Sequence, residues 1–338
     1  MYFENVSILG LAHVDAPVRM SSAAIDDQLT VALARMSLRP GLLRGLSGIV
    51  ERRYWQEGVS PSDAATLAAE KVITDTGLDR GRIGICVNTS VCRDYLEPST
   101  ACLVHGKLGL PADCLNFDIG NACLAFLTGM ETVAAMIERG AIDYGLVVDG
   151  ENSRAVVEAT IARLLAPDSS SQAYRDQFAA LTLGSGAAAM ILCRSDLAPD
   201  GHAFLGCTSV AASEWNHLCR GREDYMATDT RNLLIEGVAL AKRTWAKAVE
   251  HRGWQVDHFD EFVLHQVSKV HTENLTRALN IPLEKCHLVY SEFGNMGPAA
   301  VPVTLSKAAE RGRLNKGDRI ALMGIGSGLN CAMAEVIW

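Results

Sequence analysis

The 338-residue chain lacks the features that mark several large classes of protein. It has no basic excess, because 31 Lys and Arg stand against 39 Asp and Glu, and the net charge of −8 disfavours a nucleic-acid-binding protein. No apolar run approaches the roughly 18 residues that span a bilayer. The first residues also lack the basic and apolar regions of a secretory signal. We therefore expect a cytoplasmic protein without a transmembrane segment.

The ten cysteines lack a metal-binding pattern. None of them falls in a C-x-x-C pair, so a zinc site is not expected. Unpaired thiols without an export signal are typical of a reducing cytoplasm. Hydrophobic residues make up 49% of the chain and mean hydropathy is +0.11, which excludes global disorder and suits a large core, a buried subunit interface or an apolar tunnel.

Short β-like runs alternate with longer helical patterns along the chain. This alternation predicts an α/β fold in which helices cover a largely parallel sheet. Strands are expected at 6–14, 82–90, 115–119, 144–151, 259–268 and 318–338, the last two ranges including a loop or turn. Helices are expected at 62–77, 122–140, 233–253 and 269–280, with Ser62 as the N-cap of the first and glycines ending the first three.

The two halves of the chain share a weak repeat. A G-S-G turn occurs at 184–186 and again at 326–328, and an apolar strand pattern accompanies each turn. With the repeated order of strands and helices, this favours duplication over coincidence. We expect one half over 1–193 and another over 204–338, with the boundary in the polar stretch 194–202. Residues 152–180 show no strand period and are expected to form an insertion that acts as a lid or dimer contact.

One cysteine lies where a predicted strand turns into a predicted helix, in N-F-D-I-G-N-A-C-L-A-F (116–126). Cys123 would stand at the helix N-terminus, where the positive end of the dipole lowers the pKa of a thiol and backbone amides are free to donate. This is the geometry of a nucleophile elbow. The alternative is a buried structural cysteine, the commoner fate of any single cysteine.

Other segments carry polar groups at strand ends or in tight loops. His265, in V-L-H-Q-V-S, follows a predicted strand, and Asn295 lies in the preset loop E-F-G-N-M-G-P-A. The turn G-I-G-S-G (324–328) allows close approach of a ligand to the Ser327 amide, which would stabilise an oxyanion. Taken singly, His265 and Asn295 are better explained as structural residues and Glu97 as a solvated loop residue.

In this order the segments resemble the ketoacyl-synthase III branch of the thiolase superfamily. Within that branch the chain is similar to the OleA-type enzymes, which join two fatty acyl-CoA molecules head to head. The resemblance covers nearly the whole chain. It is carried by N-V-S-I-L-G-L-A-H-V-D-A-P (5–17), T-S-V-C-R-D-Y-L-E-P-S-T-A (89–101), N-A-C-L-A-F (121–126), E-W-N-H-L-C-R-G (214–221), H-Q-V-S (265–268) and G-I-G-S-G-L-N-C-A-M-A-E-V-I-W (324–338).

The resemblance implies a duplicated five-layer αβαβα fold and a homodimer. Cys123 would accept the first acyl group, and His265 and Asn295 would hold the enolate of the second. The amides of Cys123 and Ser327 would form the other oxyanion hole. Glu97 would remove the α-proton, acting from a loop that crosses the dimer interface into the partner's site. No metal and no cofactor besides the coenzyme A thioesters is implied.

The implied reaction is a non-decarboxylative Claisen condensation of two long-chain fatty acyl-CoAs to a 2-alkyl-3-oxoalkanoic acid, a step of long-chain olefin biosynthesis with downstream pathway enzymes as partners. After Gly297 the chain reads Pro298-Ala299-Ala300 instead of the Asn-Thr/Ser of ordinary ketoacyl synthases, which puts a malonyl substrate in doubt. Two alternatives stay open: a decarboxylative ketoacyl-synthase III, and a partner subunit of a heteromeric β-lactone or lipid pathway synthase. Arg220 and Arg222 are candidate contacts for the phosphates of coenzyme A.

Overall fold

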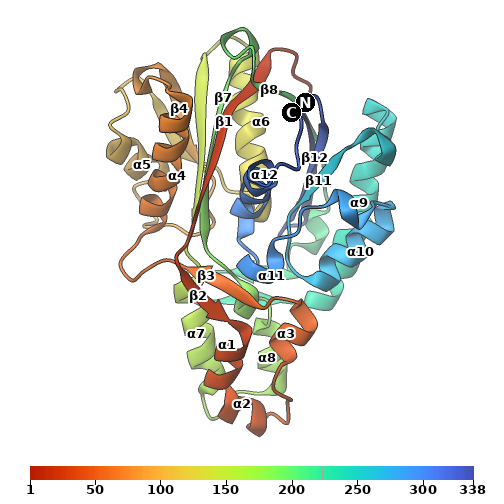
Figure 1. Cartoon of the computed structure of the whole chain (residues 1–338). Helices are drawn as coiled ribbons and strands as arrows, with labels where there is room; N and C mark the ends of the chain where they lie inside the picture. Colours follow the sequence, from red (N-terminus) through yellow and green to blue (C-terminus); the bar gives the residue numbers. More distant parts are fainter. Residues whose placement is uncertain (223) are drawn as a thin grey trace.

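A nine-stranded mixed sheet runs through the computed structural model, which describes residues 1–222 and 224–338 (Figure 1). The strand order is β11-β12-β13-β8-β1-β7-β6-β4-β5. The strands of this sheet are β1 (Val6–Asp15), β4 (Ile83–Asn88), β5 (Leu115–Asp118), β6 (Tyr144–Glu151), β7 (Gly186–Arg194), β8 (His202–Ala211), β11 (Glu261–Leu264), β12 (Arg319–Gly326) and β13 (Asn330–Ile337). Two small hairpins are formed by β2 (Val18–Ser21) with β3 (Glu51–Tyr54) and by β9 (Cys219–Gly221) with β10 (Met226–Thr228).

Helices cover both faces of this sheet and fill the space between its halves. The α-helices are α1 (Ser22–Gln28), α2 (Thr30–Arg35), α3 (Leu42–Ser47), α4 (Pro61–Thr76), α5 (Thr100–Leu108), α6 (Ala125–Glu138), α7 (Arg154–Leu165), α8 (Ser171–Gln177), α9 (Thr230–Arg252), α10 (Lys269–Leu279), α11 (Tyr290–Phe293) and α12 (Ala300–Glu310). Two short 3-10 helices border the candidate site: η2 (Ala122–Leu124) and η8 (Gly297–Ala299).

The strand pairing shows that the fold is duplicated. In the first half β1 is antiparallel to β7, β7 is antiparallel to β6, and β6 is parallel to β4. In the second half β8, β13, β12 and β11 repeat this pattern in the same order. The G-S-G turns precede β7 and β13, so they occupy equivalent places. The duplication is confirmed, and the division of the chain at 194–202 stays a prediction.

The layers follow from which helix packs on which face. Helices α4 and α5 cover the outer face of the first half, α9 and α10 cover the outer face of the second, and α6 and α12 lie between them (Figure 1). The predicted five-layer αβαβα arrangement is therefore confirmed. The prediction of a largely parallel sheet is wrong, because β7 and β13 run antiparallel to both of their neighbours.

The capping residues and glycines in the sequence predicted the ends of most of the assigned helices to within a few residues of their observed positions. Gly77 and Gly253 end α4 and α9 in the left-handed conformation, as expected. The N-cap of α4 is Ser60 and not Ser62, because Ser60 forms a capping box with Asp63 and Pro61 occupies the first helical position. The hydroxyl of Ser62 donates instead to Asp94 at 2.6 Å.

Two segments form a helical layer beneath the sheet (Figure 1). Residues 152–180 contain α7 and α8, which share an apolar cluster with α1, α2 and α3. No element was assigned to 18–54 from the sequence, although the segment holds β2, β3 and three helices. A role for 152–180 as a lid or dimer contact stays a prediction. None of the described helices is both long and apolar enough to cross a membrane.

Candidate active site

Cys123 lies in η2, directly before α6, as the sequence predicted. Strand β5 ends at Asp118, and the chain turns through Gly120 and Asn121 before the helix begins. Ala122 has a φ of 45°, in the left-handed region that residues with a Cβ adopt only at a cost. The backbone therefore holds Cys123 in a strained turn at the start of a 14-residue helix.

The predicted lowering of the thiol pKa is wrong for the isolated chain. Burial is the largest influence, and Cys219 and Glu151 act in the same direction, so the pKa of Cys123 is raised to about 12. The dipole at the helix N-terminus is outweighed by loss of solvation and by neighbouring groups that repel a negative charge. Cys123 is therefore a protonated thiol at neutral pH.

The second G-S-G turn packs against the segment that holds Cys123. A Cβ atom on Gly326 would lie 3.0 Å from the carbonyl oxygen of Asn121 and 3.3 Å from the backbone nitrogen of Leu124. Only glycine allows this approach without a shift of the neighbouring backbone. The close packing brings Ser327, the next residue, beside the turn of Cys123, and the Ser327 amide donates to no other described residue.

The first G-S-G turn packs against the loop of Asn295. The amide of Gly184 donates to the carbonyl of Asn295 at 2.9 Å, and the amide of Asn295 donates to the carbonyl of Thr182 at 2.9 Å. A Cβ atom on Gly184 would lie 1.9 Å from the carbonyl oxygen of Phe293. The repeated turn that the sequence shows is thus used twice, once beside Cys123 and once beside Asn295.

His265 and Asn295 meet side chain to side chain, and both are buried. The Nε2 atom of His265 lies 3.2 Å from Oδ1 of Asn295, and the amide of Gly297 donates to the same oxygen at 3.0 Å. A backbone amide can only donate, so the atom that it meets is the oxygen of the carboxamide. Nε2 of His265 therefore carries the proton, and Nδ2 of Asn295 is left free to donate to a ligand.

The rest of the H-Q-V-S string fixes the position of His265. The Gln266 carboxamide donates to the carbonyl of His287 at 2.7 Å and accepts from the amides of Val289 and Tyr290 at 2.7 and 3.1 Å. Ser268 caps α10 by accepting from the amide of His271. Burial lowers the pKa of His265 to about 4, so its ring is neutral at physiological pH.

Two buried carboxyl groups at the end of β6 were not singled out from the sequence. Glu151 accepts from the amide of Val91, and its carboxyl carbon would lie 3.7 Å from a Cβ on Gly297. Burial raises the pKa of Glu151 to about 7 and the pKa of Asp149 well above its usual range. The sequence did contain a signal for these two acids, because V-V-D-G-E places them in an otherwise apolar strand. Strand β6 is parallel to β4, so the carboxyl ends of both strands lie at the same edge of the sheet, where the site is.

Glu97 lies in the exposed loop between β4 and α5, away from these groups. Among the described residues, no hydrogen bond joins it to Cys123, His265 or Asn295. The loop carries exposed apolar side chains, and Leu96 is 92% accessible. Glu97 is also not among the charged groups that act on the pKa of Cys123, so the described residues of a single chain show no interaction between the two.

Arg220 and Arg222 lie on the exposed hairpin of β9 and β10. Neither side chain forms an ion pair within residues 1–222 and 224–338. The same hairpin carries Cys219, which is close enough to influence the pKa of Cys123. Cys219, the residue before Arg220, therefore lies near Cys123.

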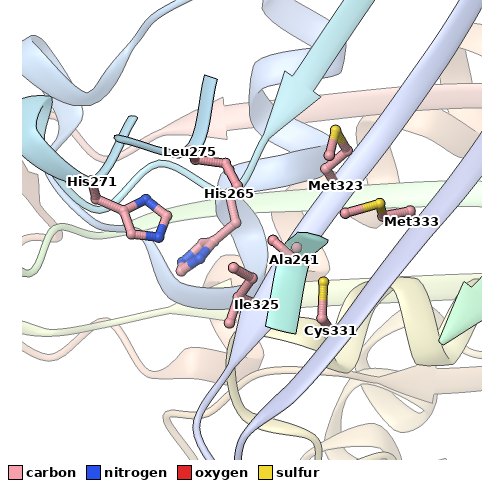
Figure 2. A pocket seen from close by; sticks show the side chains of 9 residues that line it. Ala241, His265, His271, Leu275, Met323, Ile325, Cys331 and Met333 are labelled. Carbon is pink, nitrogen blue, oxygen red and sulfur yellow. The ribbon is translucent and has the colours of Figure 1, made fainter. Parts of the chain in front are cut away.

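Two hollows adjoin the site. One, of about 270 Å³, lies between α6 and strands β8 and β13 and is lined by Asn121 and Thr128 among others. A smaller cavity of about 10 Å³ lies behind the ring of His265 (Figure 2). Within the described part of the chain, no three His, Cys, Asp or Glu side chains are grouped to hold a metal ion.

The site combines one thiol, two sets of neutral hydrogen-bond donors and a buried acidic pair. Such a set suits acyl transfer to sulfur and stabilisation of oxyanions. Family models for 3-oxoacyl-acyl-carrier-protein (ACP) synthase III match residues 117–211, and those for its C-terminal part match residues 249–338. With the duplicated five-layer fold, these matches make the chain a member of the thiolase superfamily.

Comparison with individual proteins shows to which branch of the superfamily the chain belongs. The chain is 51% identical over 338 residues to the acyl-CoA:acyl-CoA alkyltransferase of Xanthomonas campestris, covering 100% of both, and 39% identical over 350 residues to that of Shewanella oneidensis, again covering 100% of both. A crystal structure of Xanthomonas campestris OleA with cerulenin bound superposes with a TM-score of 0.98, covering 100% of this chain and 98% of that one. The chain belongs to the acyl-CoA:acyl-CoA alkyltransferases, the OleA family.

Proposed function

We propose that this enzyme condenses two long-chain fatty acyl-CoA molecules head to head without decarboxylation, giving a 2-alkyl-3-oxoalkanoic acid for olefin biosynthesis. The observation that carries the proposal is the packing of the Ser327 turn against the segment of Cys123, together with the pairing of His265 with Asn295, whose loop continues into η8 and packs against η2. Full-length identity of 51% to an acyl-CoA:acyl-CoA alkyltransferase supports it. So does a structure of a Cys→Ser variant of Xanthomonas campestris OleA that holds lauric acid and lauroyl-CoA.

The first half-reaction transfers an acyl group to sulfur. The Cys123 sulfur attacks the thioester carbonyl of the first acyl-CoA, and the amides of Cys123 and Ser327 stabilise the oxyanion that forms. The carbon–sulfur bond to coenzyme A then breaks, and the coenzyme leaves as a thiol with the proton that Cys123 gives up. Splitting the reaction at this acyl-enzyme divides one difficult step into two easier ones.

The second half-reaction needs a base, because a fatty acyl-CoA has no carboxylate to lose. Glu97 takes the α-proton, and Nε2–H of His265 and Nδ2 of Asn295 stabilise the enolate oxygen. The enolate carbon attacks the acyl-Cys carbonyl, and the Cys123 thiolate leaves and regains a proton. Hydrolysis of the remaining thioester gives the β-keto acid. This chemistry uses no cofactor besides coenzyme A.

Glu97 would act from the other subunit of a homodimer. Strand β5 is the edge of the nine-stranded sheet, and its Leu115 and Phe117 are exposed. Tyr95 and Leu96, in the loop that carries Glu97, are exposed as well. A bare strand edge beside exposed apolar side chains is typical of a subunit interface. Association through this edge would cover the patch and carry Glu97 into the partner's site.

Mixed dimers test this arrangement. In a heterodimer of Cys123→Ala and Glu97→Ala chains, the Glu97→Ala chain keeps Cys123 and faces the partner subunit's Glu97. We expect the mixture to regain on the order of a quarter of wild-type activity, since half the dimers are mixed and each holds one complete site. Each variant alone stays inactive and serves as the control. No recovery in dimers shown to be mixed would contradict action across the interface.

Arg220 and Arg222 would meet the phosphates of coenzyme A from the β9–β10 hairpin. The described ten cysteines are all free, which suits the reducing cytoplasm. Pathway enzymes that consume the β-keto acid are the expected further partners.

Incubation of the purified protein with myristoyl-CoA alone tests the reaction class. We expect release of coenzyme A and a β-keto acid or its ketone, identified by mass spectrometry. Product formed only when a malonyl thioester is added would contradict the proposal and favour a ketoacyl-synthase III. Inactivity until a second, copurifying homologue is added would favour a heteromeric synthase.

A further inference from the structure

The loop between β4 and α5, residues 89–99, is attached to the rest of the fold at both of its ends. Near its start the amide of Val91 donates to the carboxylate of Glu151 at 2.5 Å. Just past its end the amide of Ala101, in the first turn of α5, donates to Asp118 at 2.8 Å. The part of the loop that carries the proposed base lies between these two attachments.

Asp94 attaches the middle of this loop to α4. Its Oδ1 atom accepts from the hydroxyl of Ser62 at 2.6 Å, and its Oδ2 atom accepts from the backbone amide of the same residue at 3.0 Å. None of the described residues forms a hydrogen bond with 95–98, which follow directly. Glu97 is three residues from Asp94, so this attachment keeps it within about 11 Å of a fixed point.

The fixed point is firm because Ser62 belongs to the first turn of α4, which packs on the sheet. A Cβ on Gly150 would lie 2.2 Å from the carbonyl oxygen of Pro61, so this turn lies directly against the end of β6. First-turn amides have no partner within the helix and favour a carboxylate. The ammonium of Lys107, in α5, donates to the Ser62 hydroxyl at 2.5 Å, which leaves the hydroxyl proton for Asp94.

Capping of α4 does not account for this arrangement, because Ser60 already caps that helix. We propose that Asp94 is a positioning residue that holds the tip of the loop, residues 95–98, in the orientation in which Glu97 enters the active site of the partner subunit. The inference rests on the proposed function, which makes Glu97 the base that acts across the dimer. Asp94 touches no substrate and acts only through Glu97.

Substitution of Asp94 should separate the two half-reactions. Asp94→Ala removes both acceptors, and we expect kcat for condensation to fall about tenfold to a hundredfold, the effect of a base misplaced by about 1 Å, while acylation of Cys123 changes less than about twofold. Asp94→Asn keeps one oxygen for the Ser62 amide and should lose less. The control is Asp79→Ala, which removes a carboxylate that caps η1 (Arg80–Arg82) and should leave condensation within about twofold of wild type. Unchanged condensation by Asp94→Ala would overturn the inference.

Mixed dimers distinguish positioning from a general loss of stability. In a dimer of Cys123→Ala and Glu97→Ala chains, the first chain supplies Glu97 and the second supplies Cys123. Asp94→Ala added to the Cys123→Ala chain should lower the activity of the mixed dimer about tenfold or more. The same substitution added to the Glu97→Ala chain should leave that activity unchanged. Equal losses in the two arrangements, or a loss in the second alone, would overturn the inference.

Crystal structures of the wild-type and Asp94→Ala proteins show the loop without reference to catalysis. We expect α4 and α5 to keep their places in the variant and Glu97 to be displaced. Glu97 in its wild-type place would overturn the inference. If mixed dimers with Asp94 intact are inactive, the proposed action of Glu97 across the interface fails, and the two structures still decide whether Asp94 holds the loop.

Discussion

The amide of Gly184 donates to the carbonyl of Asn295 at 2.9 Å, across the two halves of the chain. The first half thereby holds the Asn295 loop of the second. In return, the G-S-G turn of the second half packs against the segment of Cys123 in the first, with a Cβ on Gly326 only 3.0 Å from the Asn121 carbonyl. Duplication thus explains more than the sheet, because each copy of the turn supports the reactive segment of the other copy.

Replacing Gly184 tests this support. In Gly184→Ala the new Cβ would lie 1.9 Å from the Phe293 carbonyl, so the Asn295 loop must shift. We expect condensation to fall at least about tenfold, a loss near 1.4 kcal/mol of transition-state stabilisation, while Cys123 is still acylated. The control is Gly106→Ala in α5, where a Cβ has no neighbour within 4 Å. Equal activity of both variants would show that the turn does not position Asn295.

The pKa of Cys123 predicts how its reactivity depends on pH. With a pKa raised to about 12, the thiolate fraction increases with pH about tenfold per unit throughout the range below that value. The rate of alkylation of Cys123 by iodoacetamide, followed by mass spectrometry of the digested protein, should therefore rise from pH 7 to pH 9 without a plateau. A plateau near neutral pH would show that the helix dipole outweighs burial.

Removal of Glu97 should separate the two half-reactions. Glu97→Ala keeps the thiol and its oxyanion donors, so we expect one acyl group on the protein and no condensed product. Glu97→Gln should behave in the same way, since an amide is not a base. Intact-protein mass spectrometry and product analysis measure the two steps separately. Glu57→Ala, another exposed glutamate, is the matched control. Unchanged product formation by Glu97→Ala would remove Glu97 from the mechanism.

Gln266 should contribute strongly to stability. Its carboxamide pairs three backbone groups of 287–290, and Gln266→Leu leaves them buried without partners. We expect the free energy of unfolding to fall by about 3 kcal/mol or more, measured by urea denaturation. Gln255→Leu, at an exposed position, should change stability by less than about 0.5 kcal/mol. Similar small changes in both would show that Gln266 does not hold this segment.

Much of the fold could be predicted from the sequence because its signals are local. The spacing of apolar residues located the helices and strands along the chain, and the glycines after α4 and α9 marked where those helices end. The two G-S-G turns indicated the duplication. The short turn between β12 and β13 already implies an antiparallel pair, and the expectation of a largely parallel sheet overlooked it. The direction of β7 could not be predicted, since it depends on where a long connection places the strand. Residues 18–54 gave no clear period because their helices are short and share one small cluster with α7 and α8.

The candidate site was predicted by residue type better than by environment. Cys123, His265 and Asn295 stood out through their turns and strand ends. The predicted thiolate form of Cys123 was wrong, because the residues that bury the thiol and the acids of β6 that raise its pKa belong to elements distant in the sequence.

The most direct test of the account is a two-step labelling experiment. The protein is loaded with myristoyl-CoA, separated from free thioester, and then given lauroyl-CoA carrying 13C at its carboxyl carbon. We predict a myristoyl adduct on Cys123 that disappears as a mixed β-keto acid forms, with the label retained in the acid and the myristoyl carbons at the keto end. A mixed product at the wild-type rate from Cys123→Ala, with no adduct, or loss of the label as carbon dioxide before the new bond forms, would contradict it.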